Sequence, residues 1–218
     1  MAKFSEQSHP CIYVIAGTNG AGKSSVIGAA IVESGAEYFN PDAVATSLLA
    51  THPSLTQQDA TSQAWQHGVR RLEQAIARKL TFAFETTLGG RTIPRLLHDA
   101  SAAGIDVKMW FIALATADLH IERVRARVAS GGHHIASATI RERYDRSRQN
   151  LVLLLPVLAE IRVFDNSVEA DPRRGRVPQP VLVLHTVRGR IEAMCQPTNV
   201  PEWAKPLVVA ALRVVQPL

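Results

Sequence analysis

The sequence predicts an α/β fold in which a mainly parallel sheet carries helices on both faces. Short apolar runs rich in β-branched and aromatic residues recur along the chain, and stretches with helical spacing of apolar residues separate them. A glycine-rich turn joins the first such run to the first helical stretch, as is typical of βα units. The 218 residues, 46% of them hydrophobic and 20% charged, suit one globular domain over residues 1–218.

The first elements follow this alternation. Residues 11–16 form a continuous apolar run between a proline and a glycine, which is typical of a strand buried on both faces. The next stretch has apolar residues at helical spacing and ends near Gly35. A short strand over 37–39 stops at the Asn-Pro-Asp turn of 40–42, and helical spacing returns over 57–79.

The second half of the chain repeats the pattern. Apolar runs again indicate strands, and glycines such as Gly104 and Gly131 end the helical stretches. No role is assigned to residues 171–218 as a whole. The expected elements are strand 80–84, helix 94–103, strand 107–114, helix 118–128, helix 140–155, and strands 161–164 and 181–184.

Composition and targeting signals indicate a cytoplasmic protein. No apolar run reaches the roughly 18 residues that a membrane span needs. The first ten residues lack the apolar core of a secretory signal. Two cysteines, Cys11 and Cys195, do not make a disulfide framework and suit a reducing compartment.

The charge balance is basic, with 24 Lys and Arg against 19 Asp and Glu, a net charge of +5. Many of the arginines fall between residues 123 and 148 and alternate with acidic residues. This pattern fits a solvated, salt-bridged helical face, or an arginine-rich segment that closes over phosphates. A surface for duplex nucleic acid is less favoured, because the chain has no lysine cluster and no interleaved aromatic residues.

The glycine-rich turn matches the pattern G-x-x-x-x-G-K-[ST] over residues 17–24. Glycine lets the backbone turn its N–H groups around a β-phosphate, Lys23 would reach the β- and γ-phosphates, and the Ser24 hydroxyl would ligate Mg²⁺. The alternative is a glycine-rich turn with an incidental lysine. The residues expected to bind a nucleotide are Gly17, Thr18, Asn19, Gly20, Ala21, Gly22, Lys23, Ser24 and Ser25.

A glycine-rich turn of this pattern is a nucleotide-binding P-loop. Other classes of P-loop protein have signatures that are missing from this sequence. The N-K-x-D sequence of GTPases is absent, and no run of four apolar residues ends in Asp-Glu, as it usually does in motor ATPases. The length fits a small-molecule kinase, in which one domain carries the P-loop, an acceptor pocket and an arginine lid. We therefore expect a P-loop kinase with a mainly parallel sheet, and ATP and Mg²⁺ as its cofactors.

Acidic residues follow two predicted strands, at the edge of the sheet where ligands of α/β proteins bind. At this place Asp42 would accept the proton of an acceptor hydroxyl, as a kinase base must. The alternative is that Asp42 caps the following helix. Glu85 would bind acceptor hydroxyls or the water shell of the metal, or else is a solvated acid in a turn.

Arginines flank the glycine-hinged turn 131–134 between two predicted helices, over about residues 118–150. Such a hairpin would close over the γ-phosphate as a lid and stabilise the charge of the transferring group. His133 and His134 lack a cysteine or carboxylate at ligand spacing, so a metal site there is not favoured. The arginines are Arg123, Arg127, Arg141, Arg143 and Arg146.

Taken in order over about residues 11–170, these segments resemble the zeta-toxin group of P-loop kinases. One departure is Ala136, where that resemblance leads us to expect proline. The segments that carry the resemblance are Gly17-Thr-Asn-Gly-Ala-Gly-Lys-Ser-Ser25, Phe39-Asn-Pro-Asp42, Phe84-Glu-Thr-Thr87, Arg127-Val-Ala-Ser-Gly-Gly-His133, Ile140-Arg-Glu-Arg-Tyr-Asp-Arg-Ser147 and Phe164-Asp-Asn-Ser167.

The resemblance implies transfer of the ATP γ-phosphate to a hydroxyl of a nucleotide-activated amino sugar, with UDP-N-acetylglucosamine the best-known acceptor. It also makes a small antitoxin protein a candidate partner. Two alternatives stay open: a kinase of another hydroxyl, such as that of a nucleoside, sugar or antibiotic, and a nucleotide-dependent regulatory or nucleic-acid-binding module.

Site roles follow from the same resemblance, by position. Asp42 would match the catalytic base and Lys23 the P-loop lysine, while Arg127 and Arg143 would match the lid arginines, with Arg123 and Arg146 as rivals. The residues that would contact the acceptor are Asn40, Glu85 and Thr86.

Overall fold

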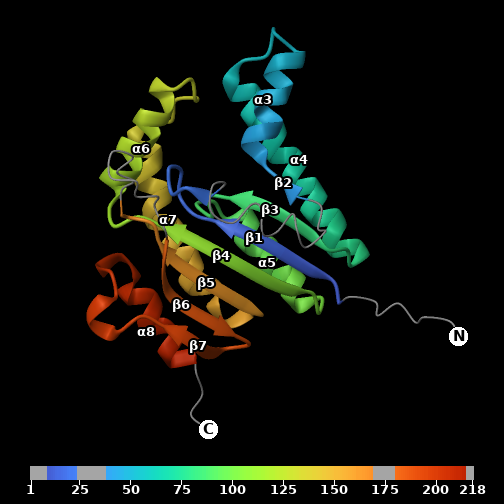
Figure 1. Cartoon of the computed structure of the whole chain (residues 1–218). Helices are drawn as coiled ribbons and strands as arrows, with labels where there is room; N and C mark the ends of the chain where they lie inside the picture. Colours follow the sequence, from blue (N-terminus) through green and yellow to red (C-terminus); the bar gives the residue numbers. More distant parts are fainter. Residues whose placement is uncertain (1–8, 24–37, 169–179, 215–218) are drawn as a thin grey trace, which may run out of the picture.

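A seven-stranded sheet crosses the described residues of the computed structural model, which are 9–23, 38–168 and 180–214 (Figure 1). In the order β2-β3-β1-β4-β5-β6-β7, the first five strands are parallel and the last two are antiparallel. The expected mainly parallel α/β sheet is thus confirmed. The strands are β1 (Cys11–Ala16), β2 (Tyr38–Phe39), β3 (Phe82–Thr86), β4 (Asp106–Ala113), β5 (Glu160–Asp165), β6 (Val181–Val187) and β7 (Arg190–Met194).

Strand β1 lies in the middle of the parallel part, paired with β3 on one side and β4 on the other. Its side chains are buried on both faces of the sheet, with Val14 and Ile15 both completely inaccessible to solvent. This double burial explains why the sequence of β1 is continuously apolar and does not alternate with polar residues.

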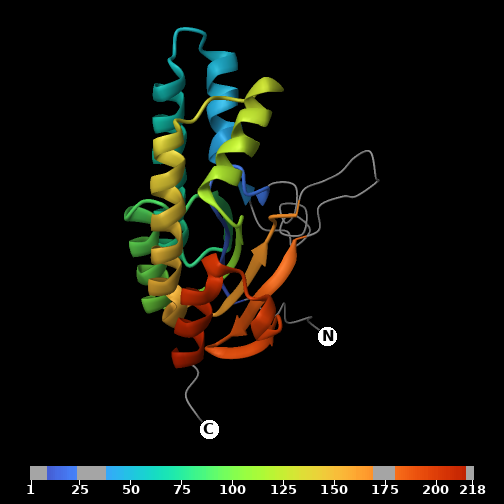
Figure 2. The ribbon, with the colours of Figure 1, turned by 90° about the vertical axis from the view of Figure 1, so that its left-hand side faces the viewer.

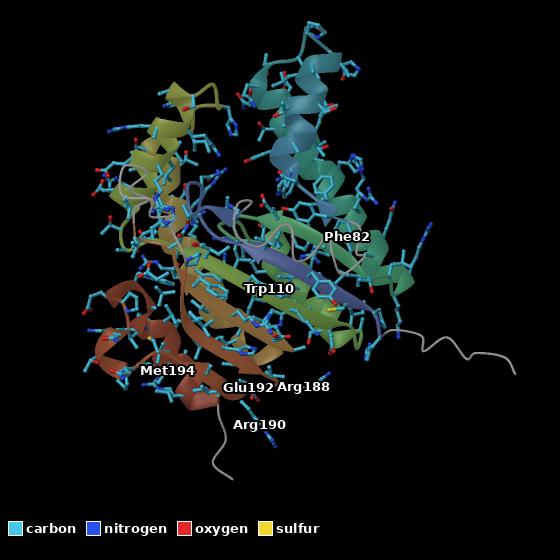
Figure 3. The ribbon with its side chains drawn as sticks, in the orientation of Figure 1. Phe82, Trp110, Arg188, Arg190, Glu192 and Met194 are labelled. Carbon is cyan, nitrogen blue, oxygen red and sulfur yellow. The ribbon has the colours of Figure 1, made fainter. Side chains whose placement is uncertain are left out.

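The helices α4, α5, α7 and α8 pack their apolar residues against one face of this sheet (Figure 2). On the other face, Ile15, Ala83 and Ile112 form a smaller cluster, beside Trp110 (Figure 3). The helix expected after the glycine-rich turn falls almost wholly outside the described residues. The described α-helices are α3 (Pro41–Thr51), α4 (Gln57–Arg78), α5 (Thr92–Ala102), α6 (Ala117–Ala129), α7 (Ser137–Leu154) and α8 (Lys205–Val214).

At residues 40–42 the sequence predicts only a turn that could start a helix, and the structure has the helix α3 there. Its N-cap is Asn40, whose side-chain oxygen accepts hydrogen bonds from the backbone N–H groups of Asp42 and Ala43. Pro41 fits the first helical position, where no N–H is needed. The alternative role of Asp42 as the cap is therefore wrong, and Asp42 lies in the exposed first turn.

Two helix pairs extend beyond the same end of the sheet. Helices α3 and α4 pack against each other, and so do α6 and α7. Figure 1 shows one pair on each side of the carboxyl ends of β1 and β4, and Figure 2 shows both pairs at the same end of the molecule. The expected helical lid over about 118–150 corresponds to α6 and α7.

The C-terminal part adds two antiparallel strands and a helix. A tight turn joins β6 to β7 at Arg188 and Gly189, both with positive φ, as a type I′ hairpin turn requires. Trp203, in the short 3₁₀ helix Glu202–Ala204, packs on Phe111 of β4 at 6.3 Å between ring centroids. Residues 181–211 thus contribute to the same core as the parallel strands.

The outer strand β7 has an exposed, charged face. Arg190 and Glu192 alternate with half-buried residues along it (Figure 3). Charged side chains on an edge strand oppose pairing with the edge of another molecule. Among the described helices, none has the length and apolar character that would let it cross a membrane.

Candidate active site

The P-loop takes a shape that requires glycine at two close approaches. Gly17 has φ +147°, and a Cβ there would lie 2.1 Å from the backbone oxygen of Ile112. Gly20 has φ +84°, and a Cβ there would lie 2.7 Å from the backbone oxygen of His120. The loop is therefore packed between the end of β4 and helix α6, and a side chain at either glycine would push it out of this position.

Lys23 follows the loop at the start of the next helical segment. Its Nζ donates a 2.9 Å hydrogen bond to the backbone oxygen of Gly17, so the lysine side chain joins the end of the loop to its first residue. Burial lowers the pKa of Lys23, and the positive charges of Arg127 and Arg143 lower it further, whereas the carboxylates of Glu85 and Asp42 act in the opposite direction. Two acids and two arginines thus lie within electrostatic reach of Lys23.

The acceptor-side residues stand at the carboxyl ends of β2 and β3. Asp42 is exposed in the first turn of α3. Glu85 is only 6% exposed, so the alternative of a solvated acid in a turn is wrong. Burial, followed by the nearby charge of Glu85, raises the pKa of the buried Tyr38 hydroxyl.

Asn40 and Thr86 have structural contacts at this place. The side-chain oxygen of Asn40 is bound by the α3 N-terminus, which leaves its Nδ2 as the group that would contact an acceptor. The backbone oxygen of Thr86 accepts a 3.2 Å hydrogen bond from the Gly17 N–H, and its Oγ1 accepts one from the Leu88 N–H. Thr86 therefore joins the end of β3 to the P-loop.

Arg143 contacts the P-loop, whereas Arg127 is exposed in the last turn of α6. Arg143 donates a 2.8 Å hydrogen bond from Nη1 to the side-chain oxygen of Asn19. Arg127 packs on Gly132 in the turn between α6 and α7, where a Cβ would lie 2.9 Å from the Arg127 Cγ. Both arginines act electrostatically on Lys23.

The other arginines of the lid have contacts elsewhere. Arg123 donates to the backbone oxygen of Asn166 at 2.8 Å, while Arg141 pairs with Asp118 and Arg146 with Glu142. These pairs resemble the salt-bridged face that was one interpretation of the arginine-rich segment. Of the five arginines, Arg143 hydrogen-bonds the P-loop, and Arg123 lies beside it, with its Cβ 3.5 Å from a Cβ placed at Gly20. Which of the arginines binds the γ-phosphate stays a prediction.

Several residues around the P-loop were missed in the sequence. Ser147 of α7 hydrogen-bonds the Thr18 hydroxyl at 3.2 Å, and the Asn166 amide donates to the backbone oxygen of Ala21 at 2.9 Å. His120 of α6 binds the backbone oxygen of Asn19 at 2.9 Å. Ser147 and Asn166 stand in segments that carry the family resemblance, and His120 shares the buried face of its helix with Ile121 and Val124, but the sequence assigned none of the three a contact with the P-loop.

The metal side of the site lies partly outside the described residues, because Ser24 and Ser25 belong to the undescribed segment 24–37. Within the described residues, no group of three or more histidine, cysteine, aspartate or glutamate side chains could hold a metal ion. The histidines 133 and 134 thus form no such group.

A family model and a relative match the sequence of this chain. A family model described as Zeta toxin matches residues 1–171. An uncharacterized protein of Haemophilus influenzae is 31% identical over 137 residues, which are 59% of this chain and 88% of that protein.

Solved structures show the same fold at low identity. In the AvrRxo1-ORF1:ORF2 complex, a chain 14% identical gives a TM-score of 0.64 and covers 96% of this chain and 72% of its own length. With sulphate ions, the corresponding chain gives 0.61, and this protein spans 65% of it. A chain of the PezAT toxin-antitoxin system of Streptococcus pneumoniae, 13% identical, gives 0.56 over 97% of this chain and 88% of its own.

Proposed function

The chain belongs to the zeta-toxin family of ATP-dependent P-loop kinases, and on that premise we propose that it phosphorylates a hydroxyl of a nucleotide-activated amino sugar such as UDP-N-acetylglucosamine. The observation that carries the proposal is the P-loop at the carboxyl end of β1, where Lys23 is bound to Gly17 and Arg143 to Asn19, with Asp42 after β2 and Glu85 near the end of β3. A kinase needs these charges together, a base for the acceptor and cations for the phosphates.

In the proposed reaction, Asp42 accepts the proton of the acceptor hydroxyl. The acceptor oxygen attacks the γ-phosphorus, a new P–O bond forms, and the bond between the γ-phosphorus and the β–γ bridging oxygen breaks to release ADP. Lys23, Arg127 and Arg143 stabilise the negative charge that spreads over the transferring group. Asp42 suits the role of base because it is exposed on α3 and still within electrostatic reach of Lys23.

The P-loop residues fit a triphosphate, because the loop is held in a form in which a Cβ at Gly17 or Gly20 would clash. Ser24 would hold Mg²⁺ together with the phosphates. The metal, when bound, neutralises the charge on the β- and γ-oxygens.

The acceptor would bind beside β2 and β3. A carboxylate at Glu85, the Tyr38 hydroxyl and the Asn40 amide offer the mixture of acceptors and donors that sugar hydroxyls and an acetamide group require. These residues support a small polar acceptor over a macromolecular one.

The test is a phosphoryl-transfer assay with γ-labelled ATP, Mg²⁺ and UDP-N-acetylglucosamine, run beside a control without acceptor. We expect label on the sugar nucleotide with the wild-type protein and none with Lys23→Ala. Label found only as free phosphate would contradict the acceptor and require a screen of nucleosides, sugars and antibiotics. The absence of any ATP consumption would contradict the proposed activity itself.

A small antitoxin protein is the proposed partner. The structurally similar chains of the PezAT toxin-antitoxin system and of the AvrRxo1-ORF1:ORF2 complex come from systems with a second protein. A cognate antitoxin co-expressed with this chain should co-purify with it and reduce the kinase activity.

A further inference from the structure

The lid helix α6 holds the P-loop through a buried histidine. His120 is completely inaccessible to solvent, and its ring makes two hydrogen bonds, one as acceptor and one as donor. The backbone N–H of Leu114 points to Nε2 at 3.3 Å, and the backbone oxygen of Asn19 lies 2.9 Å from Nδ1. Because an N–H can only donate and a carbonyl can only accept, the ring must carry its proton on Nδ1.

The ring of His120 is fixed by its neighbours. Tyr144 of α7 packs against it edge to face, with 5.5 Å between the ring centroids. The Tyr144 hydroxyl donates a 2.8 Å hydrogen bond to the backbone oxygen of Ala115, and the Arg148 guanidinium stacks on the Tyr144 ring at 3.9 Å. Both lid helices and the end of β4 therefore hold the imidazole in one orientation.

The hydrogen bond of His120 reaches the middle of the P-loop, at Asn19. His120 binds the Asn19 carbonyl with its side chain, and its own backbone oxygen closely faces Gly20. The side chain of Asn19 is in turn held by Arg143. Because His120 holds the Asn19 carbonyl oxygen toward α6, that oxygen does not face the phosphates, whose oxygens it would repel.

Burial keeps this histidine uncharged. It lowers the pKa of His120 to about 4, and the charges of Lys23, Arg123 and Arg148 lower it as well, while the hydrogen bond to Asn19 raises it. A second proton on Nε2 would also oppose the Leu114 N–H, which needs an acceptor there. The ring therefore acts as a constant donor and acceptor and not as an acid or base.

We propose that His120 is a positioning residue that sets the P-loop backbone at Asn19 for phosphate binding and couples it to the arginine lid. The proposal rests on the proposed phosphoryl transfer only for its effect on turnover, since it also predicts the affinity for ATP alone. His120 does not touch the reacting atoms. It acts through the peptide that it holds.

The test compares two conservative variants by the dissociation constant of ATP, measured by calorimetry without acceptor. The amide nitrogen of asparagine replaces Nδ1 and keeps the donor to Asn19, whereas the amide of glutamine replaces Nε2 and keeps only the partner of Leu114. We expect His120→Asn to bind ATP within about twofold of wild type and His120→Gln to lose about tenfold, the size of one hydrogen bond. His98→Asn, an exposed histidine of α5, is the matched control and should change nothing.

Each result decides the proposal. Equal ATP affinities of the two variants, or a weaker His120→Asn, would overturn it, because a merely structural histidine would not distinguish the two ends of the ring. Thermal unfolding shows whether each variant is folded. If His120→Gln is unfolded, the ATP dissociation constant of His120→Asn is compared with those of the wild type and of His98→Asn. In that case a tenfold loss in His120→Asn overturns the proposal, and retained affinity supports it. If the wild type binds ATP and phosphorylates no acceptor, the proposed function fails while this comparison still stands.

Discussion

Arg143 of the lid donates a 2.8 Å hydrogen bond to the side chain of Asn19 in the P-loop, across 124 positions of the sequence. Burial lowers the pKa of Arg143, and the charge of Asp42 opposes this effect. The arginine proposed to bind the γ-phosphate is therefore already held at the P-loop by Asn19, so less side-chain entropy is lost when ATP arrives.

The first prediction concerns the energy of this contact. Asn19→Ala and Arg143→Ala should each destabilise the protein, and the double variant should do so by less than their sum. The coupling should be about 1 kcal/mol, as for a hydrogen bond to a charged group in a partly buried place. Urea unfolding of the four proteins measures it. Additivity within about 0.3 kcal/mol would mean that the bond contributes nothing.

The second prediction concerns the base. Asp42→Asn should lower kcat by a factor on the order of 10² to 10⁴, because the acceptor hydroxyl loses its proton acceptor, and should leave ATP affinity nearly unchanged. Initial rates and calorimetry with ATP give the two quantities. Asp99→Asn, whose residue pairs with Arg95 on the exposed face of α5, serves as the control. Normal turnover by Asp42→Asn would remove Asp42 from the mechanism.

The third prediction is a loss of stability in acid caused by His120. Its pKa is lowered to about 4 in the folded protein from 6.5 in the unfolded chain, so the unfolded state binds one more proton between these values. The free energy of unfolding should therefore fall as the pH drops from 6.5 to 4, by up to roughly 1.4 kcal/mol per pH unit from this residue alone. Urea titrations at pH 5.0 and 6.5 measure the slope. His120→Asn should lack this part of it, and an unchanged slope in that variant would refute the assignment.

The fourth prediction separates the two cysteines. Burial raises the pKa of the Cys11 thiol to about 11, and its side chain is only 5% exposed in β1. Because the thiolate is the reactive form, Cys11 should resist a thiol reagent such as dithionitrobenzoate, while the half-buried Cys195 reacts first. One fast equivalent should appear in buffer and a second only in denaturant. Cys195→Ser should abolish the fast phase, and its persistence would show that the fold exposes β1.

The sequence was sufficient where the signal is local. The apolar run of β1, the glycine spacing of the P-loop and the acids at the ends of β2 and β3 are each legible within a few residues. The parallel direction of the strands also follows from the helical stretches between them. These features place Asp42, Glu85 and Lys23 at one end of the sheet.

The sequence was insufficient where long-range contacts decide. The helix α3 has apolar residues on most of its faces, which blurs helical spacing, and its start depends on the cap formed by Asn40. The candidate lid arginines cannot be told apart from the sequence, because the hydrogen bonds of Arg143 to Asn19 and of Arg123 to Asn166 span 124 and 43 positions. The partner of His120 lies 101 positions away, so no local pattern indicates it.

The central place of β1 has a consequence for how the protein is made. The ribosome synthesises β1 before either of its neighbours, and Cys11 meets Thr81 only after 70 further residues have been added. The second neighbour, β4, follows later still. Contacts this distant form slowly and leave apolar strands exposed in the nascent chain. The P-loop is also held by His120 of α6 and Arg143 of α7, so it takes its observed form only after both helices have been synthesised, and ATP stabilises no earlier intermediate.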